Sequence, residues 1–153
     1  MQALSNDVAE IQLSYRPNKK TSPTVISSSA AAYAELLKWF PQDTIALKEE
    51  FIALYLNRAN QVLGVYHVSS GGITSTISDP RLIIAVALKT AAVGIIISHN
   101  HPSGTLKASS ADQELTKRLV EACKLLDIAV LDHLIITPEY GQYLSFADEG
   151  IIR

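Results

Sequence analysis

The feature that constrains the fold most is a short, wholly apolar run from Val93 to Ile97. A strand with one face in water alternates apolar and polar side chains, whereas an unbroken apolar run suits a strand buried on both faces. Other elements must then cover both faces of the sheet that holds this strand. The run therefore predicts a layered α/β domain.

The rest of the chain supplies elements for these layers. Capping residues and apolar periodicity predict helices over about 30–37, 80–91 and 110–126. Alternating or continuous apolar runs predict strands over 51–56, 62–68, 93–97, 128–137 and, at an edge, 143–146. Strands and helices alternate without an obvious linker. We therefore expect one three-layer α/β domain with a mixed sheet between helices.

The N-terminal 28 residues have a different character. Ile11, Leu13 and Tyr15 alternate with polar residues, which favours a half-buried strand from Val8 to Tyr15. Residues 16–28 are rich in Lys, Ser, Thr and Pro, as loops are. We therefore divide the chain into an N-terminal strand and loop extension, residues 1–28, and a domain, residues 29–153.

Composition narrows the class of protein. A single cysteine, Cys123, excludes a disulfide framework and a Cys-rich zinc site, and it favours a reducing compartment. A net charge of −2 gives no support to nucleic-acid binding. The first residues lack the apolar segment of a signal peptide, and the longest apolar run, about 82–87, is too short to span a bilayer. We expect a cytoplasmic protein without membrane contact.

Two histidines follow the buried run directly. His99 and His101 are two of only four histidines, and residues i and i+2 of a strand point to the same side. Asp112 lies eleven residues beyond His101, in the first turn of the next predicted helix, and the turn at 102–104 gives the chain room to fold back. Catalytic zinc sites usually have three protein ligands and a water. The spacing thus predicts that His99, His101 and Asp112 bind one zinc ion per chain.

A metal-activated water also needs a proton acceptor for hydrolysis. Glu49 and Glu50 stand at the start of the strand predicted over 51–56, and alternation places them on opposite faces. Both faces are apolar, so this pattern does not choose between them. Ser109 carries a hydroxyl that could donate to an oxyanion on the substrate.

Each of these residues also has a simpler interpretation. Ser109 and Asp112 fit a helix N-terminus, with a serine cap and an acidic first turn, and for either residue alone that interpretation is favoured. Taken with the two histidines, the metal site is favoured. His133 fits either a hydrogen-bonding partner of a ligand or a satisfied core histidine.

The combined pattern resembles the JAMM (MPN+) metalloproteases, and more closely the bacterial RadC family. The matching stretches are Ser98–Gly104, Ser109–Asp112 and Leu131–Ile136, within a likeness that covers roughly residues 49–152. The resemblance implies a cytidine-deaminase-like (JAMM/MPN) fold and zinc held by His99, His101, Asp112 and a water. It also implies that Glu49 is the catalytic acid and base and that Ser109 stabilises the oxyanion.

The function implied by this resemblance is zinc-dependent hydrolysis of a peptide or isopeptide bond in a protein or peptide substrate, under the family's DNA-repair label. The alternative is a non-catalytic MPN-type scaffold or a DNA-processing accessory protein. Full-length RadC proteins carry a helix-hairpin-helix segment, which residues 1–28 do not resemble, and this argues against direct nucleic-acid binding. A zinc nucleobase deaminase is disfavoured because its His-x-Glu and Pro-Cys-x-x-Cys motifs are missing. Homo-oligomers formed through an edge strand are left open.

Overall fold

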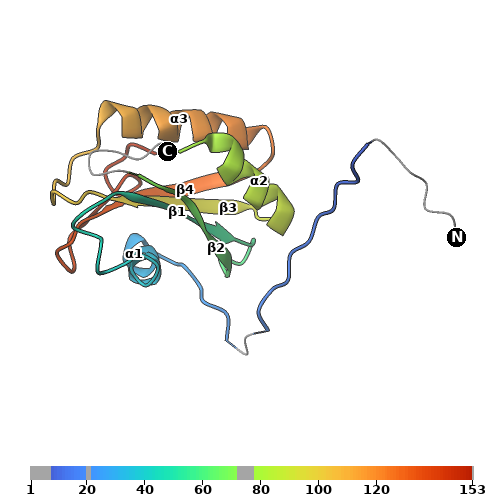
Figure 1. The fold of residues 1–153 in the computed structure, drawn as a ribbon, viewed down its shortest axis with the longest axis horizontal. Helices are drawn as coiled ribbons and strands as arrows, with labels where there is room; N and C mark the ends of the chain where they lie inside the picture. The colour runs from blue at the N-terminus through green and yellow to red at the C-terminus, as the bar shows by residue number, and fades with distance from the viewer. Residues whose placement is uncertain (1–7, 20–21, 72–77, 153) are drawn as a thin grey trace, which may run out of the picture.

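A strand buried on both faces organises the sheet of the computed structural model, which describes residues 8–19, 22–71 and 78–152 (Figure 1). All seven residues of β3 (Gly94–Asn100) are buried. This strand lies between β1 (Glu50–Leu56), which is antiparallel to it, and β4 (Ala129–Ile136), which is parallel to it. Strands β2 (Val62–Ser70) and β5 (Tyr143–Ser145) form the two edges of the five-stranded sheet. The sheet is mixed, as predicted.

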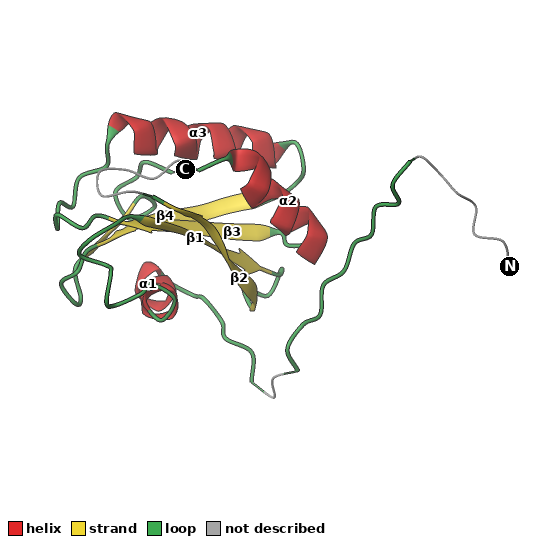
Figure 2. Cartoon of the chain, viewed as in Figure 1, coloured by secondary structure: helices red, strands yellow, loops and turns green. Residues whose placement is uncertain are grey.

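Helices cover both faces of this sheet. Helix α1 (Ser29–Leu37) packs on one face, whereas α2 (Pro80–Thr90) and α3 (Ser110–Lys124) lie together on the other (Figure 2). The predicted three-layer α/β arrangement is therefore confirmed. Within the described ranges, no helix combines the length and the apolar character needed to cross a bilayer.

The helices begin where the sequence predicts. The Ser28 hydroxyl accepts a hydrogen bond from the backbone N–H of Ala31 and caps α1. Asp79 caps α2, with Pro80 in the first helical position, where its missing N–H has no partner to lose. Helix α3 is shorter than predicted: it ends at Lys124, and Leu126, expected to belong to it, is half-exposed beyond its end.

The core has two halves, one on each side of the sheet. Side chains of successive strand residues point to opposite faces. On β1, Phe51 and Tyr55 therefore pack under α2 and α3, whereas Ile52 and Leu54 pack against α1. This parity places β3 residues with odd numbers, His99 among them, on the α3 side.

The predicted strand from Val8 to Tyr15 was wrong. Described residues 8–19 belong to no strand or helix, and Ile11 is 89% exposed. Alternation makes a stable strand only where a neighbouring strand completes the hydrogen-bond ladder, and next to β2 the isolated bridge is made by Val25, to Gln61 just before the strand. The hydroxyl of Tyr15 still donates to the Leu63 carbonyl on that edge.

Candidate metal centre

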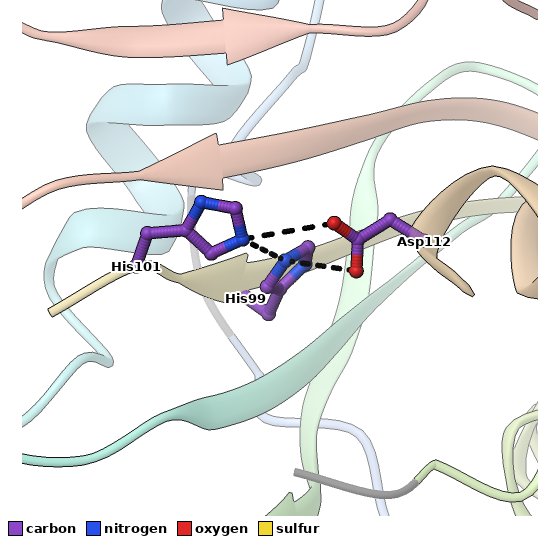
Figure 3. Close-up of side chains that lie close together, drawn as sticks. All are labelled: His99, His101 and Asp112. Carbon is purple, nitrogen blue, oxygen red and sulfur yellow. Dashed lines mark hydrogen bonds and ion pairs between the residues drawn. The ribbon is translucent and has the colours of Figure 1, made fainter. Parts of the chain in front are cut away.

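His99, His101 and Asp112 converge where the end of β3 meets the start of α3 (Figure 3). The Nε2 atoms of the two histidines are 2.9 Å apart. The Asp112 Oδ1 atom lies 3.3 Å from Nε2 of His99, and its Oδ2 atom lies 3.6 Å from Nε2 of His101. The structure thus brings together the three residues that the sequence predicted as ligands.

Sheet register and packing hold the histidines in place. His99 is the partner of Phe51 across the β1–β3 ladder, and the two rings stack with centroids 5.8 Å apart. The backbone N–H of His101 donates to the carbonyl of Ile136 at 2.8 Å, which continues the pairing with β4 beyond the last residue of β3. Both imidazoles therefore reach the α3 side from a rigid strand end.

A capping box fixes Asp112. The Ser109 hydroxyl accepts a hydrogen bond from the Asp112 backbone N–H at 3.0 Å, and Asp112 Oδ2 accepts one from the Ser109 N–H at 2.9 Å. The helix-cap interpretation of these two residues is therefore correct, and it does not compete with the metal site. The same cap holds the carboxylate toward the histidines.

The proton on His101 can be located from its partner. Its Nδ1 lies 2.7 Å from the carbonyl oxygen of Thr105, and because a carbonyl can only accept, Nδ1 must carry the proton. In the neutral ring, the lone pair of Nε2 then faces Asp112. A nitrogen acceptor that faces a carboxylate forms a pair of lone-pair donors that a cation can bind.

The electrostatics of the cluster favour positive charge. Its hydrogen bond with Asp112 raises the pKa of His101 above the ordinary value, against the effect of burial, and Glu49 adds to the rise. Burial alone would raise the pKa of the Asp112 carboxyl, but hydrogen bonds with His101 and His99 outweigh it and hold this pKa well below its usual range.

The spacing of these side chains fits a tetrahedral ion. Bonds of about 2.0–2.1 Å from a tetrahedral metal to nitrogen or oxygen hold the ligand atoms about 3.3 Å apart. The two imidazole nitrogens lie 2.9 Å apart, and each has a different Asp112 oxygen nearby, Oδ1 at 3.3 Å from His99 and Oδ2 at 3.6 Å from His101. These separations are close to that value, and one donor atom from each residue lies within 4.8 Å of the other two. Two imidazole nitrogens and a carboxylate oxygen also suit first-row divalent metals. His99, His101 and Asp112 can therefore hold a metal ion.

The structure distinguishes the two glutamates that alternation could not rank. Glu49 lines a cavity of about 340 Å³ together with His99, Asp112 and Arg118. Glu50 is buried on the opposite side, where it accepts a hydrogen bond from the Ser70 hydroxyl at 2.9 Å and pairs with Lys48 at 3.4 Å. Glu49, not Glu50, shares a cavity with the candidate ligands.

Asn100, between the two histidines, is a structural residue that the sequence reasoning missed. Its fully buried side chain points away from the metal side. Its Nδ2 donates to the carbonyls of Ile45 and Lys48 at 2.8 and 2.9 Å, and its Oδ1 accepts from the Glu50 N–H at 2.7 Å. Asn100 therefore pins the segment that carries Glu49. The available signal was a polar residue in a fully buried strand, which must find partners.

His133, whose role the sequence left open, contacts a candidate ligand. It is fully buried on β4, and its Nε2 lies 2.8 Å from Nδ1 of His99. Its Nδ1 lies 2.7 Å from the hydroxyl of Thr116, four residues after Asp112 on α3. Burial lowers the pKa of His133 well below the ordinary value, so the ring is neutral. Thr116 was not predicted, although its i+4 spacing from Asp112 put it on the same helix face.

Comparison with known proteins agrees with the motif. A family model described as the RadC-like JAB domain matches residues 26–151 of this chain. A UPF0758 protein of Flavobacterium johnsoniae is 48% identical over 103 residues, which is 67% of this chain and 44% of the relative. A UPF0758 protein of Porphyromonas gingivalis is 37% identical over 147 residues, 95% of this chain and 63% of the relative.

A third relative, UPF0758 protein YfjY of Escherichia coli, is 44% identical over 105 residues, 69% of this chain and 64% of the relative. The chain thus covers less than two thirds of the length of each of these three proteins. The family match, over residues 26–151, extends across both β3 and α3 and so includes the region of the candidate metal centre.

Proposed function

Because the chain belongs to the family of RadC-like JAB domains, we propose that it is a zinc-dependent hydrolase that cleaves a peptide or isopeptide bond. The observation that carries the proposal is the convergence of His99, His101 and Asp112, whose donor atoms lie within 4.8 Å of one another. Two histidines and one carboxylate form a ligand set used in catalytic zinc sites, which keep a further position for water or substrate.

Each residue of the centre has a role in this proposal. His99, His101 and Asp112 would hold the zinc. A zinc ion bound by three such ligands lowers the pKa of a water molecule toward ~7 and polarises a carbonyl group. The raised pKa of His101 supports this assignment, because it reflects a site that attracts positive charge.

We assign the proton transfer to Glu49. Its carboxylate would take a proton from the attacking water as the new C–O bond forms, and would give that proton to the amine nitrogen as the C–N bond then breaks. Two observations support this role: Glu49 lines the same cavity as Asp112 and His99, and its charge contributes to the raised pKa of His101. The cavity, at about 340 Å³, has the size of a small ligand site.

Ser109 is assigned to the oxyanion that forms on the substrate carbonyl. Its oxygen accepts the hydrogen bond from the Asp112 N–H, and a hydroxyl that accepts one bond keeps its own proton to donate. Its place beside Asp112 in the capping box supports the assignment. A single donor of this kind contributes about 10²–10³-fold to turnover in known hydrolases.

The test compares two adjacent glutamates. Zinc-loaded wild-type protein, Glu49→Gln and Glu50→Gln are assayed on a panel of peptides and lysine-linked isopeptides, with the zinc content of each sample measured in parallel. Glu49→Gln should keep zinc and lose about 10²–10⁴-fold in turnover. Glu50→Gln, whose carboxylate lies on the far side of the sheet, should retain both.

Chelation of the metal should abolish hydrolysis in all three samples, and added zinc should restore it in the wild type and Glu50→Gln. Turnover that survives Glu49→Gln unchanged would contradict the assignment of the proton carrier. A zinc-loaded wild type inactive on every member of the panel would favour the scaffold alternative over an enzyme with these substrates.

A further inference from the structure

A line of hydrogen bonds leads from the backbone of α3 to a candidate metal ligand. It starts at the Asp112 carbonyl, to which the Thr116 hydroxyl donates at 2.7 Å. The Thr116 hydroxyl oxygen also lies 2.7 Å from Nδ1 of His133, and Nε2 of His133 lies 2.8 Å from Nδ1 of His99. The proposed function does not use Thr116 or His133, yet both side chains are buried next to the site.

The direction of these bonds follows from the first of them. Two oxygen atoms 2.7 Å apart need a proton between them, and a carbonyl has none to offer. The Thr116 hydroxyl proton therefore lies toward Asp112, and the hydroxyl oxygen must accept from His133. Nδ1 of His133 then carries the proton of this neutral ring, and its Nε2 can only accept.

The last bond fixes His99 in turn. Because Nε2 of His133 accepts, Nδ1 of His99 must donate, and in the neutral His99 ring the lone pair is left on Nε2. That atom faces His101 and Asp112 in Figure 3. A metal can bind only an imidazole nitrogen that carries no proton.

The reverse arrangement is equally continuous but less favourable. If the Thr116 hydroxyl donated to Nδ1 of His133, the proton of that ring would lie on Nε2, which would donate to Nδ1 of His99. Nε2 of His99 would then carry a proton that faces Asp112. The hydroxyl and the Asp112 carbonyl would then oppose their lone pairs at 2.7 Å. The first arrangement instead opposes the lone pairs of Nε2 of His99 and Nε2 of His101 at 2.9 Å, a cost that a metal ion bound to both atoms removes. The helix carbonyl therefore favours the tautomer pattern that metal binding also requires.

We infer that Thr116 and His133 are positioning residues that hold His99 in its metal-binding tautomer. The inference rests on the metal site of the proposed function but not on hydrolysis. The tautomer of His101 is held separately, because its Nδ1 donates to the Thr105 carbonyl. Outer partners of this kind typically contribute 10–100-fold to metal affinity.

The first test reads the tautomers directly. Long-range ¹H–¹⁵N correlation spectra of the imidazoles are recorded on metal-free protein at pH ~9, above the ordinary histidine pKa of ~6.5. Wild-type His99 should carry its proton on Nδ1. Thr116→Val, which keeps the shape but removes the hydroxyl, should move the His99 proton to Nε2, whereas Thr116→Ser should preserve the wild-type pattern.

His101 is the internal control in the same spectra, because the Thr105 carbonyl holds its tautomer in every variant. Should Thr116→Val fail to fold, Thr116→Ala removes the same hydroxyl with less bulk. A wild-type His99 with its proton on Nε2 would overturn the inference, and so would a tautomer unchanged in the variant without the hydroxyl.

The second test measures zinc affinity by competition with a chromogenic chelator. Thr116→Val should weaken zinc binding by about 10–100-fold, and Thr116→Ser should stay close to the wild type. Equal affinities in all three proteins would contradict the inference. Failure of the wild type to bind zinc would overturn the proposed function, while the tautomer spectra would still decide the role of Thr116. The two ideas can therefore fail separately.

Discussion

Asn100 offers a quantitative test of how the site is built. Its fully buried side chain makes three hydrogen bonds to the backbone of the segment before β1 and to the first residue of that strand. Asn100→Ala removes all three and leaves the Glu50 N–H without its acceptor. The cost is about 1–3 kcal/mol for the buried orphan donor and about 0.5–1.5 kcal/mol for each of the other two bonds. We expect a loss of about 4 kcal/mol in unfolding free energy.

The assay is urea unfolding in the presence of a chelator, so that metal binding does not contribute. With a slope of roughly 2 kcal/mol per molar urea, the midpoint should fall by about 2 M. Asn57→Ala is the matched control: Asn57 also makes three hydrogen bonds, but in the partly exposed β1–β2 turn, where water can replace them. It should cost about 1 kcal/mol or less. Equal costs for the two variants would refute the claim that Asn100 pins the Glu49 segment through buried bonds.

Two further predictions concern the capping box and pH. Ser109→Ala and Ser28→Ala each remove a helix cap and should each cost about 1 kcal/mol of unfolding free energy. Only Ser109→Ala should also lower turnover. Equal turnover in the two variants would mean that Ser109 acts only as the cap of α3. In the metal-free protein, the raised pKa of His101 means that its stabilising effect is complete below the unfolded value of ~6.5 and is lost as pH rises through the folded value. The stability difference between the wild type and His101→Gln should therefore shrink from pH 6 to pH 9 in urea titrations, and a difference that grows with pH would contradict this account.

The layered fold could be predicted because local signals and tertiary packing agree. The apolar run before His99 is a buried central strand, and Ser28 and Asp79 cap helices as expected. The N-terminal segment failed for the opposite reason. The alternation of Ile11 and Leu13 describes one face of a strand, but a strand also needs a neighbour, which local sequence does not specify.

The candidate ligands were predictable because the i, i+2 spacing of His99 and His101 and the helix start at Asp112 are local. The choice of Glu49 over Glu50 from residue chemistry was not, since it depends on which face of β1 meets α3. The line of hydrogen bonds through Thr116 and His133 to His99 depends on the packing of α3 against β4 and on the register that sets Ile97 opposite His133. These long-range relations leave no periodic trace in the sequence.

Zinc stoichiometry tests the central claim most directly. Full-length protein is saturated with zinc, passed through a desalting column and analysed for metal per chain, beside His101→Ala, Asp112→Ala and the neighbouring control Glu50→Gln. The account predicts about one zinc ion in the wild type and in Glu50→Gln, and little in the two ligand variants. Full zinc retention in His101→Ala, or none in the folded wild type, would contradict it.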